Sequence, residues 1–169
     1  MDSYSEKILK ELLPAEKDIV PKAAARPVKR KQAPHSDHWS AAVLLERAAY
    51  LSKLAKHGDG SASETLKDYP RHCAMLSFRS RDGEAEVHED FADVFYVLEG
   101  RATLVTGGAV VGARLTGPGE TRGSSVEGGM RQELRVGDMA HVPAGLPHQM
   151  LVASDKVVTC LVMKIKENQ

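Results

Sequence analysis

The chain has 169 residues, enough for one domain with a modest appendage and too few for two full domains. Lys and Arg together number 23, as do Asp and Glu, so the formal net charge is zero. This balance removes the usual electrostatic argument for binding nucleic acid or a membrane surface, and we expect neither as a partner.

The sequence predicts neither a secretory signal in its first residues nor a membrane-spanning segment. The first residues, MDSYSEKILKELLP, are charged and lack the apolar stretch of a secretory signal. No apolar run approaches the roughly 18–20 residues that a membrane span needs. We therefore expect a cytoplasmic protein.

Cys73 and Cys160 lie far apart inside apolar runs. This placement favours interpreting both cysteines as small buried hydrophobic residues over a disulfide or a nucleophile.

The first part of the chain is helical or loosely structured. Residues 3–13 predict a short amphipathic helix before Pro14, with a stripe made by Tyr4, Ile8, Leu9, Leu12 and Leu13. Residues 21–35 contain three prolines and five basic residues but no acid. We interpret them as a solvated linker; the alternative is a regulator that touches nucleic acid through the basic residues 22–31.

A second helix is predicted to follow Ser40, which is a suitable N-cap. Gly58 lies just past its end, and a loop of Asp, Gly and Ser residues follows. No further helix comes close enough for a helix-turn-helix. The expected apolar face contains Val43, Leu44, Ala48, Leu51, Leu54 and Ala55.

From His72 onward the pattern changes to eight short strands separated by turn residues, and twelve of the fourteen glycines lie at or after Gly83. Such spacing is typical of an all-β sandwich or barrel. Residues 107–136 are expected to form a hairpin or a long loop at the barrel mouth. We thus predict an N-terminal helical and linker arm over residues 1–66 and a β-barrel domain over residues 67–169.

Two stretches of the β region carry chemistry-bearing residues. In the first, Glu86 and His88 share one strand face, Asp90 has the same parity, and Asp93 precedes the apolar strand that ends at Gly100. In the second, Pro143 and Gly145 form a tight reversal, and Pro147 holds Leu146 extended just before His148. Spacing alone does not show that the two stretches meet.

The two stretches resemble the two motifs of the cupin superfamily. The second motif matches nearly completely, with Gly137, Pro143, Gly145 and His148 at the family spacing and Val152 where the family often has Asn. The resemblance covers roughly residues 72–165. It implies an all-β, cupin-type jelly-roll barrel and says little about activity, because cupins support many chemistries.

The resemblance also implies a metal site. Counting back from Gly100 places Glu86, His88 and Asp93 at the ligand positions of the first motif, with His148 from the second. An alternative takes His88 as the first ligand and Asp90 as the second. The implied cofactor is a divalent ion (Zn, Mn, Fe or Ni), since no thiolate is present for softer metals. If Glu86 does not coordinate, it could serve as a general base beside a two-His, one-carboxylate set.

Other residues are assigned less specific roles. His141 and His72 either line the pocket or lie at the strand edge or barrel entrance, whereas Phe95, Val97 and Met139 are expected in the barrel core. Two functions follow from the resemblance: a metal-dependent enzyme of oxygenase, isomerase or lyase type acting on a small polar molecule, or a non-catalytic cupin, with or without metal, that binds a small ligand. The replaced His and the missing Asn are also compatible with a site that has lost its metal and become a degenerate polar pocket; metal binding is the favoured interpretation. A homodimer, paired through the arm and the edge strands, is the expected assembly.

Overall fold

The computed structural model describes residues 35–167. The predicted helix over residues 3–13 and the basic segment 22–31 lie outside the described residues. Residues 38–169 form one compact unit, which contains the helix and strands discussed below. Within the described range, no helix has the length and apolar character that crossing a membrane requires.

Helix α2 (Ala41–Lys56) forms where the capping pattern predicts it. The Ser40 side chain accepts a hydrogen bond from the Val43 backbone N–H at 3.3 Å, and this satisfies one of the free donors of the first turn. The predicted apolar face is too wide, because Val43 and Leu54 are 40% and 45% exposed. The face that packs on the sheet is narrower and consists of Leu44, Ala48, Leu51 and Ala55.

Strand β1 (Ser61–Asp68) lies where the sequence predicted a loop. It pairs antiparallel with β2 (His72–Arg79) and contributes Ala62 and Leu66 to the layer under α2. Its sequence, SASETLKD, is polar because most of the strand is only partly covered, so the alternation that marks a strand is weak. The predicted arm, residues 1–66, therefore includes a helix and most of a strand that contact the sheet.

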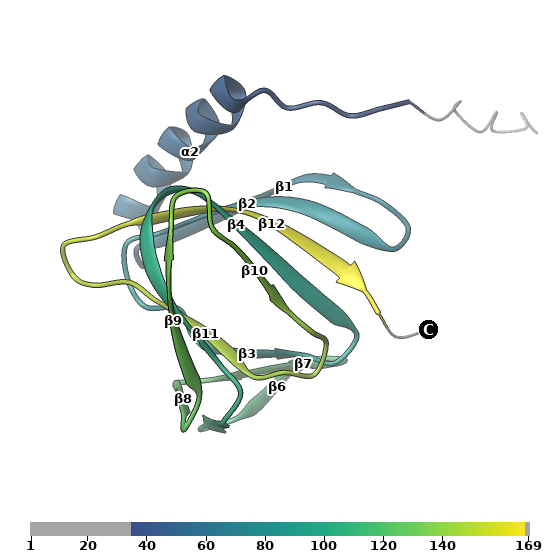
Figure 1. The fold of residues 1–169 in the computed structure, drawn as a ribbon, viewed down its shortest axis with the longest axis vertical. Coiled ribbons are helices and arrows are strands. Elements are labelled where there is room, and N and C mark those ends of the chain that lie inside the picture. The colour runs from purple at the N-terminus through teal and green to yellow at the C-terminus, as the bar shows by residue number, and fades with distance from the viewer. Residues whose placement is uncertain (1–34, 168–169) are drawn as a thin grey trace, which may run out of the picture. The chain divides into compact units, whose positions relative to one another are not determined.

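Among the described residues, ten strands form a strongly curled, antiparallel sheet (Figure 1), and β5 and β8 form a separate two-stranded sheet. The order of the larger sheet is β1-β2-β12-β4-β11-β3-β7-β6, and β9 and β10 also pair with β4. This arrangement confirms the predicted all-β, jelly-roll barrel. The remaining strands are β3 (Ala85–His88), β4 (Phe91–Thr106), β5 (Ala109–Val111), β6 (Arg114–Gly117), β7 (Glu120–Gly123), β8 (Ser125–Glu127), β9 (Met130–Arg135), β10 (Met139–Val142), β11 (His148–Leu151) and β12 (Val158–Lys166).

Strand β4 merges two strands that the sequence separated at Gly100. Its first half pairs with β12 and β10, and its second half pairs with β9 and β11, so it passes through both sides of the barrel. Gly100 makes this continuity possible: its φ is +74°, and a Cβ there would collide with the carbonyl oxygen of Val157. Only glycine fits this close approach.

The glycine-rich region 107–136 is more ordered than the predicted hairpin or long loop. It contains the short strands β5 to β8 and also β9. Strand β7 pairs with β3 in a register that places Glu120 opposite His88 and Arg122 opposite Glu86. This pairing brings two charged side chains from the region to the motif residues.

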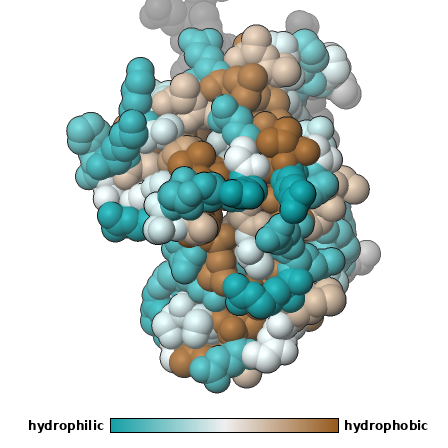
Figure 2. Space-filling view, turned by 60° about the vertical axis from the view of Figure 1, so that its left-hand side comes forward, coloured by the Kyte–Doolittle hydropathy of each residue, from teal (hydrophilic) through white to brown (hydrophobic). Residues whose placement is uncertain are grey.

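The hydrophobic core has two parts, one inside the barrel and one beneath α2. Val97 is fully buried inside the barrel, and Phe95 packs against that cluster, as predicted. Met139 was wrongly assigned to the core: it is 70% exposed on β10. On the face seen in Figure 2, hydrophobic side chains occur in small groups separated by hydrophilic ones.

Candidate metal centre

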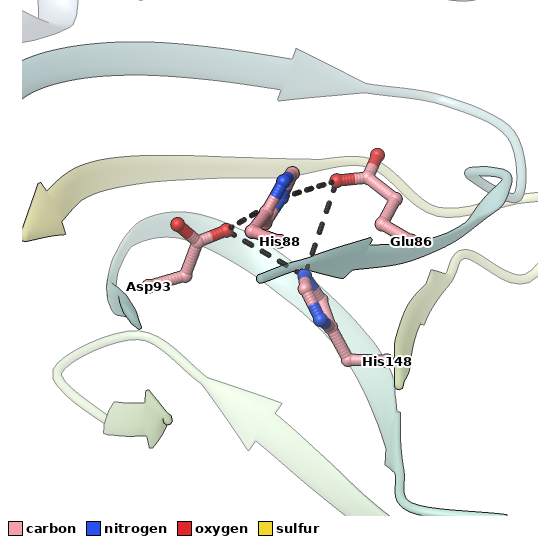
Figure 3. Close-up of side chains that lie close together, drawn as sticks. All are labelled: Glu86, His88, Asp93 and His148. Atoms are coloured by element: carbon pink, nitrogen blue, oxygen red, sulfur yellow. Dashed lines mark ion pairs between the residues drawn. The ribbon is translucent and has the colours of Figure 1, made fainter. Parts of the chain in front are cut away.

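Three strands bring the motif residues together (Figure 3). Glu86 and His88 lie on β3 with their side chains on the same face, as their spacing predicted. Asp93 lies near the start of β4, and His148 begins β11 directly opposite Glu86. The two cupin-like stretches therefore meet in space.

One potential ligand atom from each of Glu86, His88, Asp93 and His148 lies within 4.8 Å of the others. The Nε2 atom of His88 is 3.3 Å from Glu86 Oε2 and 3.5 Å from Asp93 Oδ2. The Nε2 atom of His148 lies 3.9 Å and 3.5 Å from the same two oxygens. Two nitrogens and two oxygens thus face one small volume, as a divalent ion requires.

Asp90, the carboxylate of the alternative spacing, does not join this group. It is exposed on the turn after β3, whereas Asp93 is only 2% exposed. The structure therefore brings together the residues of the first alignment and not those of the second.

The ring of His148 is oriented by the backbone of the turn before it. Its Nδ1 lies 3.2 Å from the carbonyl oxygen of Leu146. Because only a protonated Nδ1 can donate to a carbonyl oxygen, this contact leaves the lone pair on Nε2. That Nε2 is buried and has no hydrogen-bond partner among the described residues. It faces Asp93 Oδ2 at 3.5 Å and Glu86 Oε2 at 3.9 Å, so a proton on Nε2 or a metal ion between the three groups would satisfy it.

His88 is oriented from the opposite side by Glu120. The Nδ1 atom of His88 lies 2.7 Å from Glu120 Oε2, a geometry that directs Nε2 toward the other three residues. A carboxylate that receives the second N–H of a histidine is a common device for orienting a metal ligand. Glu120 therefore fits the role of a positioning residue.

Lys164 projects into the same volume from β12. Its Nζ lies 2.8 Å from His88 Nε2 and 2.8 and 3.0 Å from the two oxygens of Asp93. Burial raises the pKa of Asp93, but the adjacent histidines and the Lys164 ammonium outweigh burial and lower it. Asp93 is thus ionised at neutral pH.

The protonation of His88 is coupled to the neighbouring carboxylates and to the Lys164 ammonium. Burial lowers the pKa of His88, but the contacts with Asp93 and Glu86 outweigh burial and raise it to about 9. An ammonium can donate to His88 Nε2 only when that nitrogen carries no proton. Lys164 is paired with Asp93 in either case, so a proton on His88 adds a second positive charge beside Asp93.

Glu86 divides its two oxygens between a cation and the histidines. Oε1 lies 2.5 Å from the Arg122 guanidinium and 3.6 Å from that of Arg79, while Oε2 faces His88 and His148. Burial raises the pKa of Glu86, but the contact with His88 and the charge of Arg122 lower it to about 2. A carboxylate this acidic is a weak base at neutral pH, which argues against the general-base role considered for it.

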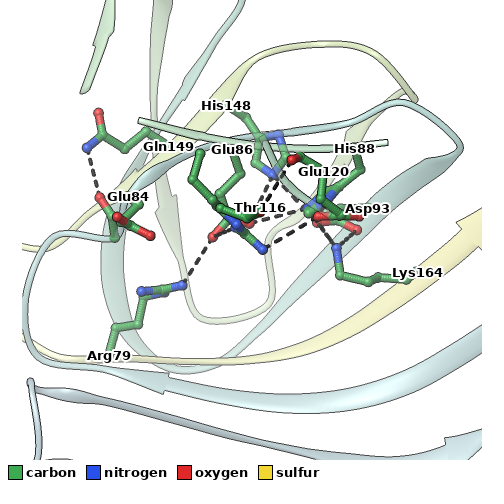
Figure 4. Close-up of polar contacts among 12 residues, drawn as sticks. Arg79, Glu84, Glu86, His88, Asp93, Thr116, Glu120, His148, Gln149 and Lys164 are labelled. Atoms are coloured by element: carbon green, nitrogen blue, oxygen red, sulfur yellow. Dashed lines mark hydrogen bonds and ion pairs between the residues drawn. The ribbon is translucent and has the colours of Figure 1, made fainter. Parts of the chain in front are cut away.

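A cavity of about 180 Å³ adjoins this group and is lined by residues of both motifs and of β2, β7 and β12 (Figure 4). Along β12, Val158, Cys160, Val162 and Lys164 all line it because they alternate along the strand. Cys160 is buried, as expected, and burial raises the pKa of its thiol to about 12. Cys73 is only partly buried, so the prediction that it is a buried residue was wrong.

The sequence interpretation missed five charged residues of this site: Arg79, Glu84, Glu120, Arg122 and Lys164. Lys164 alternates along β12 with Val158, Cys160 and Val162 on the same face of the strand, and this alternation in the sequence could have identified it.

His141 lies outside the cavity lining; it is 53% exposed and 3.7 Å from Glu167. His72 stacks on Tyr69 and is likewise absent from the lining.

No family model and no curated protein matches the sequence. Solved structures do resemble it. TT1209 from Thermus thermophilus is 21% identical over 73% of this chain and 95% of its own, with a TM-score of 0.52. The polyketide cyclase RemF from Streptomyces resistomycificus is 20% identical over 64% of this chain and 66% of its own, with a TM-score of 0.46.

The cupin domain of Schizosaccharomyces pombe Cnp3 is 11% identical over 63% of this chain and 61% of its own, with a TM-score of 0.47. At these identities the comparisons concern the fold alone. The strand order of the curled sheet and the meeting of the two motif-bearing stretches at Glu86 and His148 agree with the resemblance found in the sequence. The chain therefore has the cupin fold, a jelly-roll β-barrel.

Proposed function

We propose that this cupin barrel holds one divalent metal ion through Glu86, His88, Asp93 and His148 and binds a small polar molecule in the adjoining cavity. The observation that carries the proposal is the buried Nε2 of His148, which has no hydrogen-bond partner within the described residues and faces the two carboxylates. A metal ion would satisfy this nitrogen and neutralise both carboxylates at once.

The donor set restricts the ion and its chemistry. Imidazole nitrogens with carboxylate oxygens suit zinc, manganese, iron or nickel. Two anionic ligands leave a divalent ion close to neutral, which lowers its strength as a Lewis acid relative to a set of three histidines and one carboxylate. A metal-dependent enzyme of oxygenase, isomerase or lyase type and a binding protein that uses the ion as an anchor both fit this centre.

Elemental analysis tests the proposal. The purified full chain is incubated with Zn²⁺ or Mn²⁺ and desalted, and its metal content is compared with that of His88→Ala and His148→Ala. His141→Ala is the matched control, because His141 is exposed and outside the group. We expect about one ion per chain in the wild type and the control, and at least a tenfold loss of affinity in the two site variants. Equal metal content in all four proteins would contradict the proposal.

Lys164 supports a second candidate function. Its Nζ lies within 3.0 Å of His88 Nε2 and of both Asp93 oxygens and supplies a positive charge beside Asp93 without any metal. The barrel would then be a metal-free pocket for a small ligand. Failure of the wild-type chain to retain Zn²⁺, Mn²⁺, Fe²⁺ or Ni²⁺ would favour this function over the first.

A further inference from the structure

We propose that the cavity beside the centre binds a small organic anion with an apolar body, and that Arg79, Arg122 and Lys164 receive its anionic group. This inference rests on the proposed metal centre and specifies the ligand of that site. It is carried by the charges around the cavity and by the apolar side chains that share its lining.

The charges leave a positive excess once an ion is bound. Three side-chain cations line the cavity: Arg79, Arg122 and Lys164. The partly buried Glu86 and the buried Asp93 face them, and a divalent ion cancels the charge of both carboxylates. The third carboxylate of the lining, Glu84, is 53% exposed and paired with Arg114 at 2.5 Å. Glu120 lies 3.6 Å from Arg122 and offsets one of the three positive charges. Two positive charges in a partly buried space then remain, and an anionic ligand is the group that compensates them.

The three cations come from different strands and flank the centre from two sides: Arg79 and Arg122 face Glu86 Oε1, and Lys164 contacts Asp93. Arg79 ends β2, Arg122 lies on β7, and Lys164 lies near the end of β12. Each side chain is about one quarter exposed, so a ligand can reach it. Figure 4 shows Arg79 and Lys164 directed toward Glu86 and Asp93, respectively.

Two of the cations have capacity for a ligand. Arg79 approaches Glu86 only at 3.6 Å, which is too long for a hydrogen bond. The Lys164 ammonium lies 2.8 Å from His88 Nε2, the nitrogen that an ion would coordinate. Once an ion is bound there, the ammonium hydrogen nearest this nitrogen is free to donate to a ligand. Guanidinium and ammonium groups together favour a carboxylate or a phosphate over a neutral polar group.

Much of the cavity lining is apolar. Met75, Phe95, Met150 and Val162 line the cavity and belong to the barrel core or pack against it. An inorganic anion would leave these side chains in contact with water, whereas an aliphatic or aromatic body would cover them. The ligand class that fits both the cationic and the apolar side chains of the lining is therefore a small carboxylate or phosphate with an apolar chain or ring.

Hexanoate is a suitable probe, because hexanamide is its neutral counterpart and acetate lacks the apolar body. The full chain is loaded with Mn²⁺, bound Mn²⁺ is quantified by electron paramagnetic resonance, and relaxation of the probe protons is measured by NMR. We expect hexanoate to bind at least tenfold more tightly than either hexanamide or acetate. Its C2 protons should relax faster than its methyl protons, because the carboxylate lies at the metal end. Equal binding of hexanoate and hexanamide, or the reverse order of relaxation, would overturn the inference.

Two variants locate the anionic group. Arg79→Met and Lys164→Met should each reduce the preference for hexanoate over hexanamide at least fivefold while retaining Mn²⁺. Arg131→Met is the matched control, since Arg131 is exposed on β9 and not in the cavity lining. An unchanged preference in both variants would overturn the inference. Failure of the wild type to bind Mn²⁺ would instead refute the metal centre on which the inference rests, so the two failures are distinguishable.

Discussion

Lys164 and Asp93 lie directly opposite each other on β12 and β4, and the Lys164 ammonium contacts both oxygens of the Asp93 carboxylate. The same ammonium reaches His88 Nε2 at 2.8 Å. Lys164 therefore occupies, in charge and in position, part of the volume that a metal ion would take. Metal binding and the contact between Lys164 and His88 exclude each other.

Replacing Lys164 with Met should destabilise the metal-free protein and strengthen metal binding. The buried Asp93 carboxylate would lose its ammonium partner, at a cost of about 2 kcal/mol, below the value for a fully buried pair because Lys164 is partly exposed. The ion would no longer compete with the ammonium. Thermal denaturation with and without Zn²⁺ checks both effects: we expect a lower melting temperature without metal and a larger rise on adding it. An unchanged rise would refute the competition.

Glu120→Gln should weaken metal binding without unfolding the barrel. The Glu120 carboxylate accepts from His88 Nδ1 and orients the ring, and loss of such a partner lowers metal affinity about 10–100-fold. Titration calorimetry with Zn²⁺ measures the change. Glu133→Gln is the control, because Glu133 is exposed on β9 and pairs only with Arg135 among the described contacts. Equal affinities in the two variants would remove Glu120 from the positioning role.

Metal affinity should rise with pH up to about 9. The pKa of His88 is raised to about 9 in the metal-free site, so near neutral pH an ion must displace a proton from Nε2. Each pH unit below 9 should then weaken binding by up to about tenfold. Calorimetry in two buffers of different ionisation enthalpy should show close to one proton released per ion at pH 7 and almost none above pH 9. Affinity that does not change between pH 7 and pH 9 would contradict the assignment of His88.

Gly100→Ala should destabilise the barrel by at least about 3 kcal/mol, because its Cβ would collide with the carbonyl of Val157 at a positive φ. Gly137→Ala is the matched control. Gly137 also has a positive φ of 89°, but nothing lies within 4 Å of its added Cβ. This variant should show only the backbone strain, about 1 kcal/mol. Urea denaturation distinguishes the two, and equal losses of stability would show that the contact with Val157 does not matter.

Much of the barrel was predictable because its strands follow local patterns. Strands β2 and β12 alternate or run apolar between turn residues, and Ser40 marks the start of α2. Strand β1 was missed because its sequence is largely polar. The continuity of β4 through Gly100 was missed because a glycine between two apolar runs is typical of a turn. In both cases pairing with a neighbouring strand decides the structure, and local sequence does not encode it.

The candidate site was predictable only where a motif fixed the spacing. Glu86, His88, Asp93 and His148 were all named from the sequence, and the structure brings them together. Glu120 and Arg122 lie in a glycine-rich region without a clear pattern, and only the register of β7 against β3 places them at the site. The metal ligation, the domain boundary at residues 66–67, the homodimer and the cytoplasmic location remain predictions.

X-ray absorption at the zinc edge of the zinc-loaded chain tests the central claim most directly, because it observes the ligands themselves. We predict two imidazole nitrogens and carboxylate oxygens at about 2.0–2.2 Å from the ion. In His148→Ala the imidazole signal should fall to that of a single ring. A spectrum with oxygen neighbours only, or one that His148→Ala leaves unchanged, would contradict the metal centre.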